Sequence, residues 1–133
     1  MTRSEILANR KTWIAYLKRP DIIKWEGSLS HPGNGWADDK YNNRCCLGHG
    51  CHALDIEFDA YAGYNSELTV KAGLWTPRGS TKSHAAIKKG VPSLQYLNDK
   101  TDATPQDIGE YLESVIEGGE DTPFKPLSMF DAG

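Results

Sequence analysis

Residues 44–56 form the stretch of this chain whose residue types could carry chemistry. Their sequence, RCCLGHGCHALDI, holds all three cysteines and two of the four histidines of the protein. We expect a strand that runs into a short helix here, with Cys45, Cys46, Gly48 and His49 at the junction.

One interpretation of this junction is a binding site for a small anion. If a helix begins near Cys46, its unpaired backbone amides and its dipole favour negative charge in front of it. Gly48 and Gly50 would let a phosphate or carboxylate approach the backbone closely, and Arg44 would add a charge-assisted contact. The candidate ligand-binding residues are Tyr41, Arg44, Cys45, Cys46, Gly48, His49 and Gly50.

A second interpretation is a nucleophilic cysteine. A thiol at a helix N-terminus with imidazoles nearby has a lowered pKa and a larger thiolate fraction. In outline this resembles papain-like cysteine hydrolases, and the base would be His49, His52 or His84. The candidate catalytic residues are Cys45, Cys46, His49 and His84.

A third interpretation is a metal site, and a fourth is ordinary packing. Five possible ligands lie within eight positions, namely Cys45, Cys46, His49, Cys51 and His52. Adjacent cysteines fit one tetrahedral ion poorly, and a second C-x2-C pair is missing, so we expect neither a metal nor another cofactor. In the packing interpretation the thiols of Cys46 and Cys51 are buried with Leu47, while His49 and His52 face outward.

The remaining elements predict an α+β fold in a single domain, residues 1–133. A capping box at Thr2 opens a helix over residues 3–18, which ends before Pro20. Turn residues at 31–35 predict a hairpin with strands near 25–30 and 40–46, and loose alternation over 56–70 predicts one or two further strands. We therefore expect a small antiparallel sheet packed with the N-terminal helix, the cysteine-bearing helix and a C-terminal helix.

Two more helices follow in the sequence. Ser80 caps a short one that continues to Lys89 and stops at Gly90. Thr104 and Asp107 form a capping box for the last helix, which carries an apolar stripe and ends at Gly118-Gly119. Residues 118–133 are expected to be extended over the core or partly disordered.

Composition and charge restrict the class of protein. No apolar run approaches 18 residues and no secretion signal is recognisable at the N-terminus, so we expect no membrane contact. Three cysteines, two of them adjacent, fit a reducing cytoplasm. Residues 1–98 carry 13 Lys or Arg against 9 Asp or Glu, and residues 99–133 carry 2 against 9. No concentrated basic stripe is present, so sequence-specific DNA binding is not expected.

Three parts of the sequence resemble a family of small, functionally uncharacterised proteins of tailed bacteriophages and their prophages. They are Trp13 and Leu17 in the first helix, the CCLG-x-x-C motif that spans Cys45 to Cys51, and the stretch LNDKTDATPQDIGEYLE over residues 97–113, an LND turn followed by a helix. The resemblance implies a phage accessory protein in the cytoplasm of the host bacterium, with a role in host takeover or counter-defence.

We therefore expect a nonenzymatic accessory protein that binds a small anionic, nucleotide-like ligand or a host protein. One alternative is a cysteine-dependent hydrolase or transferase that uses Cys45 or Cys46. Another is an inhibitor whose acidic helix, residues 107–117, docks onto a basic host surface as a nucleic-acid mimic would. The sequence also leaves a homo-oligomer open.

Overall fold

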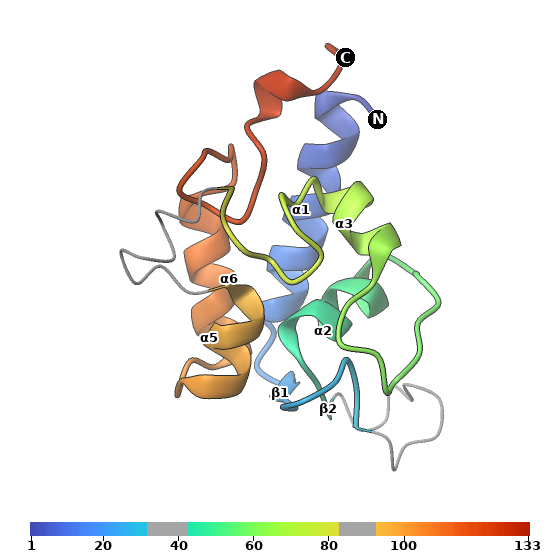
Figure 1. The fold of residues 1–133 in the computed structure, drawn as a ribbon, viewed down its shortest axis with the longest axis vertical. Coiled ribbons are helices and arrows are strands. Elements are labelled where there is room, and N and C mark those ends of the chain that lie inside the picture. The colour runs from blue at the N-terminus through green and yellow to red at the C-terminus, as the bar shows by residue number, and fades with distance from the viewer. Residues whose placement is uncertain (32–42, 83–92) are drawn as a thin grey trace.

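The computed structural model describes residues 1–31, 43–82 and 93–133. These residues form an α+β fold dominated by helices, as predicted (Figure 1). The elements in chain order are α1 (Arg3–Leu17), β1 (Ile23–Lys24), β2 (Asn43–Arg44), α2 (Cys46–Ala53), α3 (Ser66–Ala72), α5 (Leu94–Lys100), α6 (Pro105–Ser114) and the 3-10 helix η2 (Leu127–Met129).

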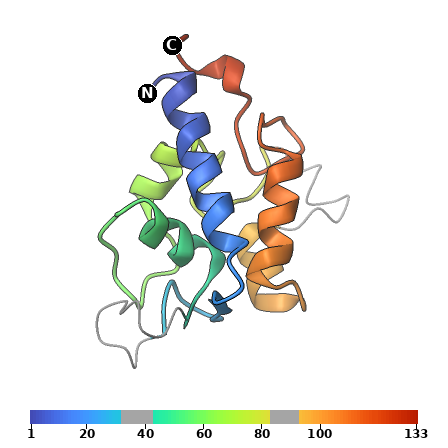
Figure 2. The same cartoon turned by 180° about the vertical axis from the view of Figure 1, so that it is seen from behind.

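Helix α1 is the central element of the fold. It begins where predicted, because the Thr2 hydroxyl accepts the amide of Glu5 at 3.2 Å. The helix lies between α6 on one side and α2 and α3 on the other (Figure 2). Its buried stripe therefore meets three other helices, and it consists of Ile6, Arg10, Trp13, Ile14 and Leu17.

Helix α6 has the capping box that the sequence predicts. Thr104 Oγ1 accepts the amide of Asp107, and the Asp107 carboxylate accepts the amide of Thr104. The helix ends at Ser114, earlier than the glycine pair that was expected to end it. Gly118 adopts a φ of 85°, and its Cβ position would lie 2.2 Å from the Lys125 carbonyl oxygen, so only glycine fits this turn.

The sheet is parallel, so the antiparallel prediction was wrong. Strands β1 and β2 pair over two residues, with Ile23 opposite Asn43 and Lys24 opposite Arg44. An isolated antiparallel bridge joins Ser30 to Arg44. Strand β1 therefore lies on one side of β2, and after a turn at Gly27 the segment at Ser30 lies on the other side of β2. Most of the predicted hairpin turn lies outside the described residues.

The strands predicted over residues 56–70 are also wrong, because Ser66–Ala72 forms α3. The Asn65 side chain accepts the amide of Leu68 at 3.1 Å, and this cap favours a helix over a strand. The LND residues lie in α5, a helix that the sequence analysis did not predict. The helix predicted from Ser80 falls mainly in 83–92, outside the described residues.

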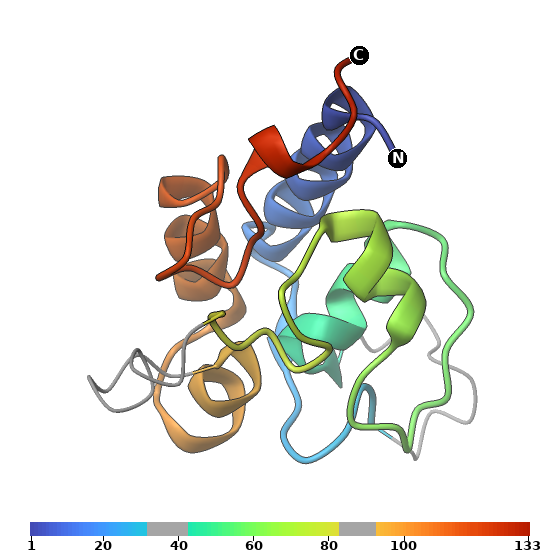
Figure 3. The same cartoon turned by 45° about the horizontal axis from the view of Figure 1, so that its top comes forward.

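The C-terminal segment, residues 118–133, packs along the body of the fold. The Arg3 amide donates to the Asp131 carbonyl at 2.8 Å, so the two termini lie together (Figure 3). Phe124 is fully buried, and its ring stands edge-on to Trp13 with centroids 6.1 Å apart. This segment therefore completes the core around Trp13.

Arg10 ties the C-terminal segment to the helices. Its guanidinium is buried and donates to the carbonyls of Ala72, Gly73, Ile116 and Lys125 at 2.7 to 3.2 Å. The same group lies 4.3 Å from the centroid of the Phe124 ring. Burial lowers the pKa of Arg10 to about 10, so the side chain stays charged near neutral pH. In the described part of the chain, no helix is long and apolar enough to cross a membrane.

Candidate functional site

The cysteine-bearing element is a strand-to-helix junction, as the sequence predicts. Strand β2 ends at Arg44, Cys45 is the N-cap with φ −71° and ψ 168°, and α2 begins at Cys46. The cap is the Cys45 sulfur itself, which accepts the Gly48 amide at 3.3 Å. One of the free amides of the helix start is therefore satisfied by the thiol.

The amide of Cys46 is satisfied by a residue far away in sequence. It donates to Oδ1 of Asn98, on α5, at 3.0 Å. Asn98 is fully buried, and its Nδ2 donates to the Trp25 carbonyl at 2.7 Å and to the Asp99 carboxylate at 2.8 Å. The position in front of the helix that an anion would take is therefore filled by an amide side chain of the protein.

The two glycines of α2 allow other parts of the chain to pack closely against the helix. A Cβ on Gly48 would lie 1.9 Å from the carbonyl oxygen of Leu29, and one on Gly50 would lie 2.9 Å from the Trp13 ring. Trp13 Nε1 also donates to the Cys46 carbonyl at 3.0 Å. Close packing of α1 and the Leu29 segment against α2 therefore accounts for both glycines without a ligand.

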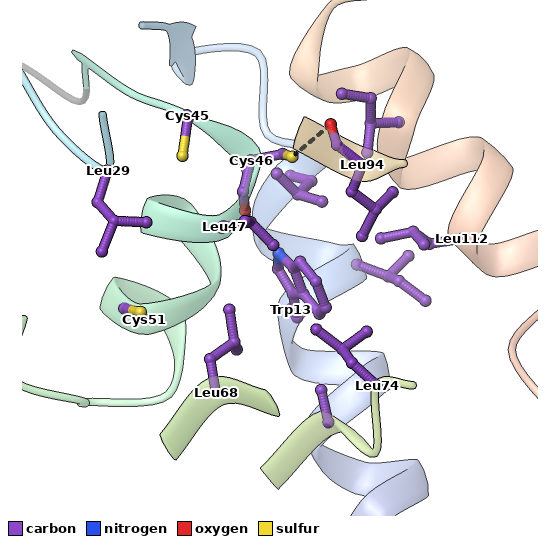
Figure 4. Close-up of a cluster of buried hydrophobic side chains, with 14 of the residues drawn as sticks. Trp13, Leu29, Cys45, Cys46, Leu47, Cys51, Leu68, Leu74, Leu94 and Leu112 are labelled. Carbon is purple, nitrogen blue, oxygen red and sulfur yellow. Dashed lines mark hydrogen bonds between the residues drawn. The ribbon is translucent and has the colours of Figure 1, made fainter. Parts of the chain in front are cut away.

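All three thiols lie in the core (Figure 4). Burial raises the pKa of Cys45 and of Cys51 to about 12, and it raises the pKa of Cys46 well above its ordinary value. The Cys46 sulfur points at the Leu94 carbonyl, 3.6 Å away. A thiolate is therefore strongly disfavoured at all three positions, which removes the main physical support for a nucleophile.

His49 is buried, whereas the packing interpretation expected it to face outward. Its Nε2 lies 2.8 Å from the Ile23 carbonyl, so Nε2 carries the proton. Burial, with a smaller contribution from the charge of Arg44, lowers the pKa of His49 to about 3. The Tyr16 ring lies against both His49 and half-buried His52, with centroids 5.7 and 5.4 Å apart.

Of the other predicted site residues, Arg44 is fully buried, and Tyr41 and His84 lie outside the described residues. Over the ranges 1–31, 43–82 and 93–133, no three His, Cys, Asp or Glu side chains are placed to hold a metal ion.

A small hollow lies beside Cys45, between the loop after α2 and helix α5. Its volume is about 10 Å³, enough for one water molecule and too small for a nucleotide. The Gln95 side chain in its lining is held by two hydrogen bonds, because Nε2 donates to the Gly63 carbonyl and Oε1 accepts from Arg78 at 2.7 Å. The residues that line it are Ser28, Cys45, Gly63, Gln95 and Asp99.

An exposed and strongly acidic segment consists of the loop before α6, α6 itself and the turn that follows it. Residues 101–124 contain no Lys, Arg or His, and all seven of their carboxylate side chains are exposed. We call this set the acidic face, and it consists of Asp102, Asp107, Glu110, Glu113, Glu117, Glu120 and Asp121. The acidic composition was visible in the sequence, whereas the exposure of every member required the fold.

Comparison of the chain with protein-family models, curated proteins and solved structures finds no match. The function must therefore be inferred from the geometry of the molecule itself. Asn98 occupies the N-terminus of α2, and other parts of the protein fill the space beside its two glycines. The carboxylates of the acidic face are exposed to solvent. The acidic face is the stronger candidate for contact with another molecule.

Proposed function

We propose that this chain is a nonenzymatic accessory protein of a tailed bacteriophage that binds a host protein through the acidic face. The observation that carries the binding mode is the exposure of seven carboxylates in a segment without a basic residue. The phage setting rests on the resemblance of the CCLG-x-x-C and LND motifs alone.

The arrangement of charge on α6 supports a role in binding. Glu110 and Glu113 are three residues apart and therefore lie on one side of α6, and Glu117 follows in the turn after the helix. Negative charge near a helix C-terminus opposes the helix dipole, and like charges at this spacing repel. No basic residue lies in the last turn of α6, so the pairing of Glu113 with Lys18 of α1 offsets this charge only in part. A placement that is unfavourable for the helix alone is typical of functional surfaces.

The class of partner follows from the sign of the charge. Strongly basic protein surfaces are typical of proteins that hold nucleic acid, since they must neutralise phosphates. A carboxylate-rich helix that covers such a surface would compete with the nucleic acid for it. We therefore propose a nucleic-acid-binding protein of the host cytoplasm as the target, which is consistent with a role in host takeover or counter-defence.

The alternative of a small nucleotide-like ligand at α2 has less geometric support. The backbone amides of Cys46 and Gly48, at the start of α2, already donate to acceptors within the protein. Titration with a panel of linear and cyclic nucleotides tests it directly. A rise in the melting temperature with any of them would favour that site over the acidic face.

A charge-reversal experiment tests the proposed function. Tagged protein is incubated with lysate of the host bacterium, and bound proteins are eluted by raising NaCl to about 1 M, where the Debye length is about 3 Å. The variant Glu110→Lys/Glu117→Lys is compared with Glu57→Lys/Glu67→Lys, which changes the net charge equally through exposed residues elsewhere. The retained host protein is identified and purified, and its affinity is measured for the wild type and for each of the two variants.

The proposal requires one saturable, salt-sensitive partner. Its affinity must fall at least about tenfold with the reversal on α6 and little with the control reversal, because only the former changes the contact surface. Equal loss with both variants would indicate attraction by net charge alone. Retention that survives high salt and both reversals would exclude the acidic face as the binding surface.

A further inference from the structure

The acidic face contains a hollow where α6 ends. It has a volume of about 390 Å³, and its wall combines half-buried aliphatic side chains with one exposed carboxylate. The residues that line it are Ser114, Val115, Ile116, Glu117, Gly118 and Thr122. The hollow is large enough for one long side chain of another protein and faces the solvent beside the turn into the C-terminal segment.

The carboxylates around this hollow differ in the partners they already have. Lys18 Nζ lies 3.1 Å from the Glu113 carboxylate, and Lys82 Nζ lies 3.5 Å from that of Glu120. Within the described residues, Glu117 makes no ion pair. Glu117 is therefore the carboxylate in the lining of the hollow that is available to a cation from outside.

The nearest buried charge does not fill the hollow. Arg10 donates to the Ile116 carbonyl at 2.8 Å from the inner side, and three further carbonyls and the Phe124 ring surround its guanidinium. Its guanidinium is therefore bound to backbone carbonyls behind the wall and not to Glu117. The hollow itself presents Val115 and Ile116 beside Glu117.

We propose that this hollow receives one arginine or lysine side chain of the basic partner, an inference that rests on the proposed function. The apolar stem of such a side chain would lie on Val115 and Ile116 while its cationic head meets Glu117, since long basic side chains bury their stems and keep their heads in polar surroundings. The contact would fix the position of the partner along the acidic face. The other carboxylates would attract the partner without fixing where it binds.

A short peptide probe tests the hollow without knowledge of the partner. The peptide acetyl-Gly-Gly-Arg-Gly-Gly-amide is titrated into ¹⁵N-labelled protein, with the uncharged citrulline peptide as its control. The largest amide shifts are expected at residues 114–118 and 122. Glu117→Gln should weaken binding roughly threefold to tenfold, whereas Glu110→Gln, on α6 and outside the hollow, should weaken it much less.

The results separate this inference from the proposed function. Shifts spread evenly along the acidic face, equal loss with Glu117→Gln and Glu110→Gln, or equal binding of the citrulline peptide would each overturn the hollow as an anchor. The proposed function would survive those results if the reversal on α6 still abolished partner binding. If the peptide binds the hollow but no host protein depends on α6 charge, the proposed function fails and the local affinity for a cation remains.

Discussion

The Cys46 amide donates to Oδ1 of Asn98 at 3.0 Å, and this bond joins the CCLG-x-x-C and LND motifs into one unit. Asn98 also donates to the Trp25 carbonyl, so one buried side chain connects α5, the start of α2 and the chain after β1. The asparagine has the acceptor that a helix start needs and the donor that a buried carbonyl needs. The two motifs therefore have a structural explanation that requires no ligand.

Replacement of Asn98 tests this explanation. Asn98→Ala leaves the Cys46 amide and the Trp25 carbonyl without their partner inside the fold, so it should lower the free energy of unfolding by about 2–4 kcal/mol. Lys100→Ala, at an exposed position on the same helix, should change it by less than about 0.5 kcal/mol. Urea unfolding followed by tryptophan fluorescence measures both. An Asn98→Ala protein as stable as the control would show that the bond contributes little.

The glycines of α2 make a second prediction. A methyl group at Gly48 would overlap the carbonyl oxygen of Leu29, whereas one at Gly63 would lie 3.6 Å from the Gln95 side chain, an ordinary contact. Gly48→Ala should therefore lose at least about 3 kcal/mol of stability or fail to fold, because a backbone oxygen cannot move aside freely. Gly63→Ala serves as the control and should fold normally. Thermal unfolding by circular dichroism distinguishes the two, and a fully stable Gly48→Ala protein would contradict the close packing of α2 against Leu29.

The cysteines make a third prediction, about reactivity. Because burial raises the pKa of Cys45 and Cys51 to about 12, the folded protein should react with iodoacetamide at pH 7 more than about a hundredfold slower than N-acetylcysteine. Unfolding in guanidinium should expose all three thiols to alkylation, which intact mass spectrometry counts. Fast labelling of a single cysteine in the folded protein would instead support the cysteine-dependent enzyme.

Local signals predicted the fold best where they were complete within a few residues. Thr2 and the Thr104–Asp107 capping box located the starts of α1 and α6, because their hydrogen bonds are made within one turn. The strand prediction for residues 56–70 was wrong because their aromatic and β-branched residues resemble a strand, whereas the Asn65 side chain caps a helix. The parallel pairing of β1 with β2 depends on contacts between distant segments, which local patterns do not encode.

The junction of strand and helix at the cysteines was predicted in position, whereas its surroundings were not. The sequence located the junction of β2 with α2, because glycines and cysteines cluster there. It could not show that Asn98, 52 positions after Cys46, reaches the helix start, nor that Leu29 and Trp13 occupy the space beside Gly48 and Gly50. Glycines needed for internal packing and glycines needed for a ligand look identical in sequence.

His49 makes the fourth prediction, on the pH dependence of stability. Burial lowers its pKa from an ordinary 6.5 to about 3, and the charged or titratable groups that also influence it are Arg44, His52 and Asp21. Below pH 6.5 the unfolded chain binds a proton at this position that the folded protein does not bind. The stability associated with neutral His49 is therefore complete above pH 6.5 and is lost as the pH falls toward 3.

The expected slope approaches about 1.4 kcal/mol per pH unit, so the loss from this residue should reach about 2 kcal/mol near pH 5. Urea unfolding at several values between about pH 7.5 and 4.5 measures it above the range in which most carboxylates titrate. His49→Gln keeps a donor for the Ile23 carbonyl but does not titrate, so its stability should vary much less over the same interval. If the wild type and His49→Gln lose stability in parallel, the proton uptake belongs to other groups, and His49 is not held neutral by its burial against Tyr16.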